Sequence, residues 1–348
     1  MIRHGPSGRR PAVVAALVLA AGALRLTACG APLAVTDLAA DDGLRWYKGN
    51  THTHTTESDG DSPPDTVAAW YRDHGYHFLV LSDHNRLTSV GALNALYGRD
   101  EGFLLIRGEE VSDVFAGKPV HINGLAVDSL VAPQGGATVV ELLQRNVDAI
   151  RAAHGVPHIN HPNYFAAVSP EDLMQVRRTR LFEVYNGHHP VANEGGNGVL
   201  PLEEAWDRIL SAGLTVYGIA VDDAHHFKEP ERTTKAGPGR GWVMVRARRL
   251  TADSILASLE RGEFYATTGP ELSGLRITRD EYVVAVVPAA GRTERIQFIG
   301  DSGKVLLDVP GPFGRYAIRG TEGYVRARIV GSDGKKAWTQ PVRPVSPR

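Results

Sequence analysis

Asn50-Thr51-His52-Thr53-His54-Thr55 directly follows a short apolar stretch near the start of the chain. Alternate residues of a β-strand point to the same face, so a strand here would aim the imidazoles of His52 and His54 at one point. Imidazole nitrogen is a common ligand of divalent transition metals. Two histidines at this spacing also occur in half-buried strands that bind no metal. The pair alone therefore does not show a metal site, and the other residues of the chain distinguish the two cases.

Further residues with metal-binding side chains follow or lie within later apolar runs. These motifs are Ser82-Asp83-His84-Asn85, Gly108-Glu109-Glu110, Val120-His121-Ile122-Asn123, His158-Ile159-Asn160-His161 and Asp222-Asp223-Ala224-His225-His226. Short apolar runs are typical of buried parallel strands. The chain is therefore predicted to place imidazoles and carboxylates at the ends of successive strands.

Helices are predicted between several of these strands. Ser62-Pro63-Pro64-Asp65 is typical of a helix start, with Ser62 as the N-cap of a helix that ends at about His74. A second helix is indicated by an apolar face formed by Val139, Leu143, Val147 and Ile150, and two more are predicted at 201–210 and 251–259. The repetition of strand, ligand motif and helix predicts an α/β fold, a β/α barrel with its reactive groups at the carboxyl ends of the strands.

The order of these motifs resembles that of the PHP (polymerase and histidinol phosphatase) superfamily of metal-dependent hydrolases. The residues that carry the resemblance are His52-Thr53-His54, Asp59, Ser82-Asp83-His84-Asn85, Gly108-Glu109-Glu110, His121, His161-Pro162 and Asp223-Ala224-His225. They extend over roughly residues 46–270. The resemblance implies a distorted seven-stranded β/α barrel and a site for up to three metal ions.

The resemblance also implies a ligand set for each metal. The residues that would hold the first metal are His52, His54, Glu110 and Asp223. Those that would hold the second are Glu110, as a bridge, with His121 and His161. Those that would hold the third are Asp59, His84 and His225. Glu109 competes with Glu110 for the bridging position, but the family spacing Gly-x-Glu selects Glu110.

The predicted ligands indicate which metals and which chemistry to expect. Mixed imidazole and carboxylate ligands suit zinc, manganese or iron better than calcium or magnesium. Two or three such ions, about 3.5–4 Å apart, would share a hydroxide, lower its pKa and stabilise an anionic transition state. Glu110, Asp223 and His225 are the predicted catalytic residues, and the chain has no serine or cysteine nucleophile signature.

Phosphoester hydrolysis is the leading predicted function, because a multinuclear cationic site complements the charge of a phosphoryl transition state. The resemblance implies small substrates such as nucleotides or short oligonucleotides. Carbamate or carboxyl-ester hydrolysis is an alternative, because residues 261–270 and the C-terminal tail resemble PHP proteins of the CehA/McbA type. A non-catalytic metal-binding lipoprotein is a second alternative, which is disfavoured because scavenging proteins more often contain a contiguous histidine-rich tract.

Four residues are candidates for contacts with a small-molecule substrate. Arg86 and Arg240 follow ligand motifs, and a guanidinium group can pair with phosphate or carboxylate through two hydrogen bonds. An ordinary surface arginine is the equal alternative for both. His158 and His226 are neighbours of predicted ligands, and each is expected either to support a ligand from behind or to face the substrate.

The first 43 residues predict export. Three arginines precede an apolar segment at 12–24, which is too short to span a bilayer and typical of a signal peptide. Leu26-Thr27-Ala28-Cys29-Gly30 resembles a bacterial lipoprotein box, so residues 1–28 are the predicted signal peptide and Cys29 the lipid attachment site. Residues 29–43 would tether the protein to the cell envelope. Cys29 is the single cysteine of the chain, so a disulfide within the chain is excluded.

Residues 44–270 are predicted to form the barrel, and the pattern changes after residue 270. Short runs typical of a small accessory β-sandwich occur in the segment 271–348, at 282–287, 295–299, 305–309, 315–318 and 324–330. Residues 229–241, which are rich in glycine and proline, are predicted as a lid or a connector at the barrel mouth.

The charge of the predicted mature chain bears on its partners. Without residues 1–28 the chain has 34 basic and 39 acidic residues, a formal charge of −5. No extended nucleic-acid surface is expected, because such a surface requires a basic stripe. Membrane contact is expected only through the lipid anchor.

Overall fold

The computed structural model describes residues 1, 36–37, 43–97, 102–196 and 198–344. The predicted signal peptide, Cys29 and most of the predicted tether lie outside the described residues. Among the helices of the described part, none has the length and apolar character needed to cross a membrane.

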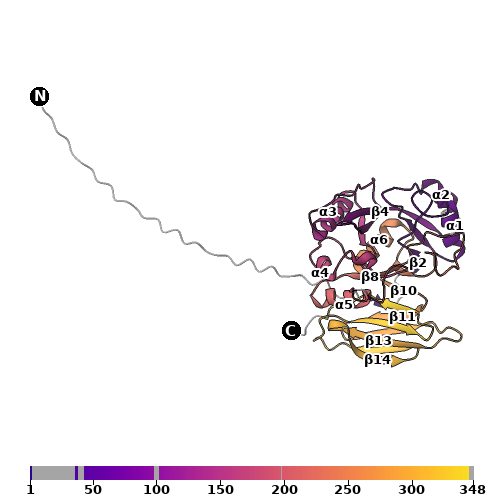
Figure 1. Cartoon of the computed structure of the whole chain (residues 1–348). Helices are drawn as coiled ribbons and strands as arrows, with labels where there is room; N and C mark the ends of the chain where they lie inside the picture. Colours follow the sequence, from indigo (N-terminus) through magenta and orange to yellow (C-terminus); the bar gives the residue numbers. More distant parts are fainter. Residues whose placement is uncertain (2–35, 38–42, 98–101, 197, 345–348) are drawn as a thin grey trace. The chain divides into compact units, whose positions relative to one another are not determined.

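A mixed sheet of 13 strands is the main element of the fold, in the order β14-β13-β16-β17-β10-β9-β2-β3-β4-β5-β6-β7-β8 (Figure 1). Its first nine strands in the chain are β2 (Arg45–Asn50), β3 (Phe78–Leu81), β4 (Leu104–Phe115), β5 (Lys118–Leu125), β6 (Val156–Ile159), β7 (Leu181–Asn186), β8 (Tyr217–Val221), β9 (Trp242–Ala247) and β10 (Phe264–Thr267). Strands β2, β3 and β4 are parallel, as are β6, β7 and β8. Burial on both faces explains the near-continuous apolar runs of β3 and β8.

Strand β5, which carries His121, was predicted as one of the parallel strands, and this prediction is wrong. It pairs antiparallel with both β4 and β6. Ala116 and Gly117 form the connection from β4, with φ angles of 50° and 79°. Positive φ at both central residues is typical of a type I′ turn, whose twist matches that of a hairpin. A two-residue turn permits only an antiparallel return of the chain.

Six α-helices are present in the described residues: α1 (Pro64–Asp73), α2 (Gly91–Tyr97), α3 (Val139–Ala152), α4 (Pro170–Leu173), α5 (Leu202–Ser211) and α6 (Ala252–Arg261). Helix α3 has the predicted apolar face, and its Leu143, Val147 and Ile150 are fully buried against strand residues such as Ile122. The predicted N-cap Ser62 is wrong, because Pro63 occupies that position and the Ser62 hydroxyl donates to Asp61 Oδ1 at 2.7 Å.

The C-terminal part is all β. Its strands are β11 (Leu272–Ile277), β12 (Glu281–Val286), β13 (Glu294–Gly300), β14 (Lys304–Pro310), β15 (Phe313–Ala317), β16 (Arg326–Gly331) and β17 (Lys336–Thr339). Strands β11, β12 and β15 form a small antiparallel sheet with β1 (Thr36–Asp37), while β13, β14, β16 and β17 belong to the large sheet. Strand β17 pairs with β10, so one hydrogen-bonded sheet continues across the predicted boundary at residue 270.

A buried ion-pair network connects α5 to β16. Arg326 has no exposed surface, and its Nε and Nη2 donate to the two Asp207 oxygens at 2.8 and 2.6 Å. Its guanidinium group also lies 4.7 Å from the centre of the Trp206 ring. Arg326 Nη2 donates to Glu203 Oε1 as well, at 2.8 Å.

Asp207→Ala is expected to lower the free energy of unfolding by ~3–5 kcal/mol, because it leaves a buried guanidinium charge without its main partner. Asp308→Ala is the control, since the Arg295–Asp308 pair at 2.9 Å is largely exposed and should contribute less than ~1 kcal/mol. Urea denaturation of both variants measures the difference. Equal losses in the two variants would contradict a structural role for the network.

The start and the end of the α/β part meet beside β2. Asp223 N donates to His52 O at 3.1 Å, and His54 N donates to Ala224 O at 2.9 Å. On the other side, Ser82 N donates to Thr53 O at 3.0 Å. The His-x-His segment therefore lies between the segments that follow β3 and β8. Asp223 adopts φ 50°, a conformation that non-glycine residues rarely adopt and that these contacts hold in place.

Candidate metal centre

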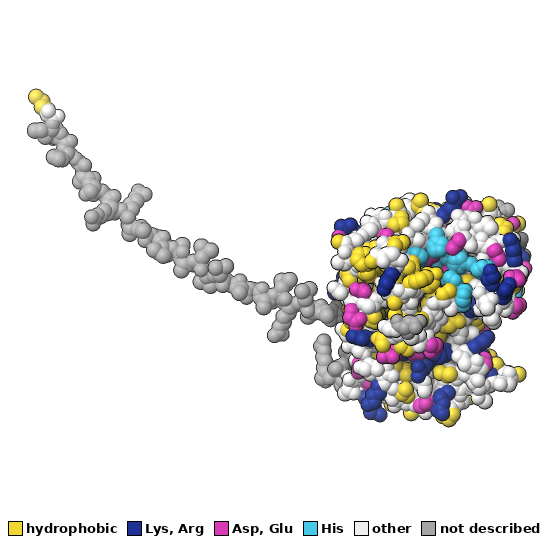
Figure 2. Space-filling view, viewed as in Figure 1, with side chains coloured by type: hydrophobic (Ala, Val, Ile, Leu, Met, Phe, Trp, Pro, Cys, Tyr) yellow, Lys and Arg dark blue, Asp and Glu magenta, His cyan; other side chains and the backbone are white. Residues whose placement is uncertain are grey.

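All nine predicted ligands lie in one cluster at the carboxyl-end side of the strands. They are His52 and His54 after β2, Asp59 in the next loop, His84 after β3, Glu110 and His121 within β4 and β5, His161 after β6, and Asp223 and His225 after β8. Figure 2 shows histidine side chains gathered on one face of the molecule. Overlapping groups of three or four of these residues have ligand atoms within 4.8 Å of one another.

Four ligand atoms converge at the centre of this cluster. Nε2 of His52 lies 3.3 Å from both Glu110 Oε2 and Asp223 Oδ1. Nε2 of His54 lies 3.3 and 3.1 Å from the same two oxygens. His52 Nε2, His54 Nε2 and Glu110 Oε2 are buried and have no hydrogen-bond partner. Buried polar atoms are rarely left unsatisfied, and a cation between them would satisfy all three.

The two oxygens of Glu110 face different histidines. Oε1 lies 2.9 Å from His121 Nδ1 and 3.2 Å from His161 Nε2, whereas Oε2 faces His52 and His54 and lies 3.0 Å from His84 Nδ1. The Glu110 carboxylate therefore contacts histidines on both of its sides. Glu109 points elsewhere, because its Oε1 accepts a hydrogen bond from Val131 N at 2.6 Å. Glu110, and not Glu109, therefore lies among the predicted ligands, while its role as a bridge stays a prediction.

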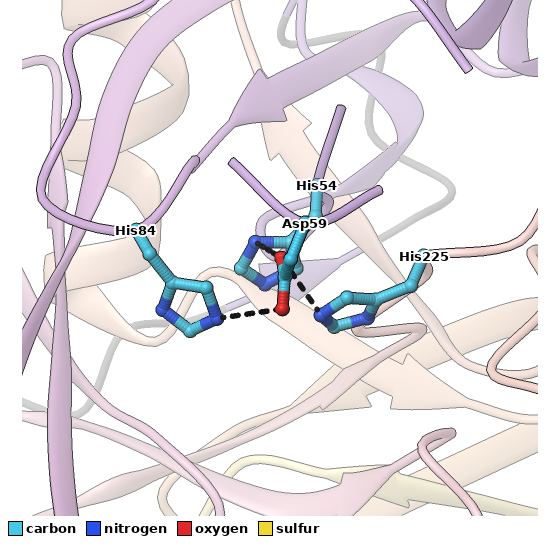
Figure 3. A group of neighbouring side chains, drawn as sticks. All are labelled: His54, Asp59, His84 and His225. Atoms are coloured by element: carbon cyan, nitrogen blue, oxygen red, sulfur yellow. Dashed lines mark ion pairs between the residues drawn. The ribbon is translucent and has the colours of Figure 1, made fainter. Parts of the chain in front are cut away.

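A third group forms around Asp59 (Figure 3). Its Oδ2 lies 3.5 Å from His84 Nε2, and its Oδ1 lies 3.3 Å from His225 Nε2 and 3.7 Å from His54 Nδ1. The Asp59 side chain is 55% exposed, while His54 and Glu110 are buried. This group is therefore the part of the cluster nearest to solvent.

The electrostatics of the cluster keep its carboxylates ionised. Burial would raise the pKa of Glu110, but His84, His52 and His121 outweigh that effect and hold the pKa well below its usual range. The pKa of Asp223 is likewise lowered, against burial, chiefly by the charge of His52. Ionised carboxylates are the form that coordinates a metal.

Comparison with solved structures identifies the fold. No protein-family model matches the chain, and no curated protein matches it. A two-domain protein from Bacteroides vulgatus, which contains a predicted PHP-like metal-dependent phosphoesterase, superposes over 88% of this chain and 97% of its own with a TM-score of 0.52 and 17% identity. The fold is PHP-like. At this level of identity the likeness concerns the fold alone.

Two other structures resemble about half of the chain. One is a proposed metal-dependent phosphoesterase from Bifidobacterium adolescentis, with 17% identity over 51% of this chain and 87% of its own and a TM-score of 0.38. The other is an amidohydrolase from Chromobacterium violaceum with bound sulfate and no metal, with 16% identity over 52% of this chain and 88% of its own and a TM-score of 0.37.

Glu183 is a residue of this cluster that the sequence did not single out. It is fully buried in β7, where its Oε1 lies 2.7 Å from His52 Nδ1 and its Oε2 accepts from His161 N at 2.6 Å. A carboxylate behind a metal-binding histidine fixes the tautomer and the orientation of the ring. The available signal was an acidic residue within the apolar run Leu181-Phe182-Glu183-Val184.

The four candidate substrate contacts lie in different environments. His158 is fully buried, and its Nε2 lies 3.3 Å from Glu183 Oε1. This position suits a residue that orients Glu183, which in turn contacts the predicted ligand His52. His226 is half-buried, and its backbone N donates to Ala236 O at 2.9 Å. The Arg86 side chain is 60% exposed and pairs with Glu57 at 2.7 Å.

Arg240 is held by backbone groups. Its guanidinium group donates to Gly187 O and Arg232 O, both at 3.0 Å, and its backbone N donates to Asp222 Oδ1 at 2.6 Å. These bonds attach the segment 229–241 to the end of β8 and to the loop after β7. In the structure Arg240 thus holds a connecting segment in place.

Proposed function

We propose that this chain is a metal-dependent hydrolase whose substrates are small phosphoesters. The observation that supports it most strongly is the convergence of His52 Nε2, His54 Nε2 and Glu110 Oε2, three buried atoms without hydrogen-bond partners, beside Asp223 Oδ1. A divalent cation between them would satisfy both imidazole nitrogens and both carboxylate oxygens at once.

We further propose that strands β2 to β8 form the seven-stranded barrel implied by the PHP resemblance. The bridge between Thr53 and Ala224 supports this, since it brings the end of the first strand to the end of the last. Such closure explains why ligands from distant parts of the sequence meet at one point.

The proposed ligand sets are those implied by the resemblance, with zinc, manganese or iron as the metals. When bound, two or three such ions would supply a hydroxide near neutral pH and offset the charge of the transition state. With a metal bound, His52 would be neutral and its Nδ1–H would donate to Glu183 Oε1, which directs the Nε2 lone pair at the cluster. Glu110 would place one negative charge between the group with His52 and His54 and the group with His121 and His161. Substrate would enter beside Asp59, which is exposed.

We prefer phosphoester hydrolysis to carbamate or carboxyl-ester hydrolysis because many proposed metal ligands lie close together. Nine ligands for two or three cations produce a site that suits a substrate with several anionic oxygens. A neutral carbamate would require a more apolar pocket beside the metals. The two functions differ in their response to inorganic phosphate, which resembles the product of phosphoester hydrolysis.

Inorganic phosphate is expected to inhibit competitively at millimolar concentration, and Arg86→Ala should raise its inhibition constant ~5-fold, as expected for an exposed charge pair. Arg240→Ala should have a smaller effect on inhibition, because its guanidinium group is already bonded to two carbonyls. Steady-state kinetics with a phosphomonoester and a neutral aryl ester provide the measurement. Activity untouched by phosphate, with ester turnover above phosphoester turnover, would favour the alternative hydrolase.

The location of the protein remains a proposal based on the sequence. Cys29→Ser is expected to move the protein from the membrane fraction to the soluble fraction, because no other cysteine can accept a lipid. Fractionation of cells that express each form, followed by immunoblotting, measures this. Retention of the variant with membranes, as for the wild type, would contradict the lipoprotein proposal.

A further inference from the structure

An exposed aromatic residue lies in the turn that follows the proposed ligand His161. The side chain of Phe165 is 67% exposed. Phe165 and the next residue, Ala166, have φ angles of 52° and 51°. Non-glycine residues rarely adopt this region, and strained backbone is concentrated at functional sites. The turn therefore presents a large apolar side chain to solvent at a conformational cost.

Hydrogen bonds fix this turn in place. The Nδ2 of Asn163, a residue only 8% exposed, donates to Ala192 O and Leu200 O, both at 2.8 Å. Lys118 Nζ donates to Ala166 O at 2.9 Å. These contacts come from β5 and from the loop after β7, so the strained turn is held from two sides. A backbone held in this way reduces the conformational entropy that the turn loses when a ligand packs on it.

The aromatic turn is continuous with the proposed metal centre. The ring of Tyr164 lies 5.2 Å from that of His161, 4.7 Å from that of Phe165 and 5.9 Å from that of His188. His188 is partly exposed, and its Nδ1 lies 3.6 Å from Asp223 Oδ2. Figure 2 shows hydrophobic side chains beside the histidines on this face. Phe165 extends the aromatic surface from Tyr164 toward solvent.

We propose that Tyr164 and Phe165 form an aromatic subsite, which binds a planar ring attached to the ester that the metal centre hydrolyses. The proposal rests on the proposed function and specifies its substrate class. An aryl group and a nucleobase offer the same flat face, and aromatic side chains stack on either. The metal centre would hold the phosphoryl group while the ring packs on Phe165.

The test measures the binding of phosphonates, which are not hydrolysed, by calorimetry on the protein as purified. Phe165→Ala is expected to weaken phenylphosphonate binding ~10-fold, the usual loss of one stacking contact, and methylphosphonate binding far less. Phe165→Tyr should restore phenylphosphonate binding. Phe313→Ala is the matched control, since Phe313 is 56% exposed on β15. Adenosine 5′-phosphorothioate, tested in parallel, distinguishes a nucleobase from an aryl group.

Each outcome decides the proposal. A selective loss of affinity for phenylphosphonate or for the nucleotide supports the subsite and shows whether it binds an aryl group or a nucleobase. Equal loss of phenylphosphonate and methylphosphonate would show that Phe165 acts only on the shape of the turn, and no loss would show that it contacts neither ring. Either result overturns the subsite while leaving the phosphoesterase proposal intact. A wild-type protein that binds none of these ligands would instead overturn the proposed function, and the subsite with it.

Discussion

Glu110→Gln is expected to lower the catalytic efficiency by ~10²–10³-fold while the protein stays folded. Glutamine has the same shape, but it lacks the negative charge that faces His52 and His54 on one side and His121 and His161 on the other. The loss of one preorganised electrostatic group from an active site has effects of this size. Weaker metal binding is expected to lower the catalytic efficiency further, because the first and the second proposed metal share this carboxylate.

The measurement combines kcat/KM with metal analysis of the purified variant. Glu109→Gln is the matched control, because Glu109 is also buried but bonds to Val131 N, away from the cluster. We expect the control to retain metal and activity. Full metal occupancy together with normal turnover in Glu110→Gln would remove Glu110 from the site.

Removal of the metals by a chelator is expected to abolish activity and to lower the thermal unfolding temperature. A cation that binds only the folded state stabilises it in proportion to the logarithm of its concentration over the dissociation constant. Without it, the buried Nε2 atoms of His52 and His54 keep no partner. Zinc, manganese or iron should restore both properties, and calcium or magnesium should restore them much less.

Activity and unfolding temperature are to be followed on the same samples, with metal content measured by mass spectrometry. A matched sample treated with the metal-saturated chelator controls for direct effects of the reagent. A metal-free protein that hydrolyses phosphoesters at the normal rate would contradict the proposed chemistry.

The proximity of the cluster residues could be predicted because most of them belong to short local motifs at or near a strand end, while Asp59 entered only through the family resemblance. Asp223 and His225, for example, are two residues apart in one motif, and the carboxyl ends of parallel strands bring such motifs to one place. Glu183 was missed for the opposite reason. Nothing near it in the sequence shows that it contacts His52, which is 131 residues away.

The direction of β5 and the extent of the large sheet could not be predicted from the sequence pattern either. The turn Ala116-Gly117 lacks the asparagine or aspartate that usually signals a hairpin, so its positive φ angles appear only in the structure. The pairing of β10 with β17 depends on residues about 70 positions apart. Such long-range pairings follow from packing between whole segments, which local periodicity does not encode.

Anomalous X-ray diffraction from crystals grown with zinc or manganese tests directly whether metals bind at Glu110. At least two peaks are expected, about 3.5–4 Å apart, on either side of the Glu110 carboxylate. One peak should lie among His52 Nε2, His54 Nε2 and Asp223 Oδ1, and the other beside His121 and His161. Crystals of active protein with no metal between these residues, or with metal bound only elsewhere, would contradict metal binding at Glu110.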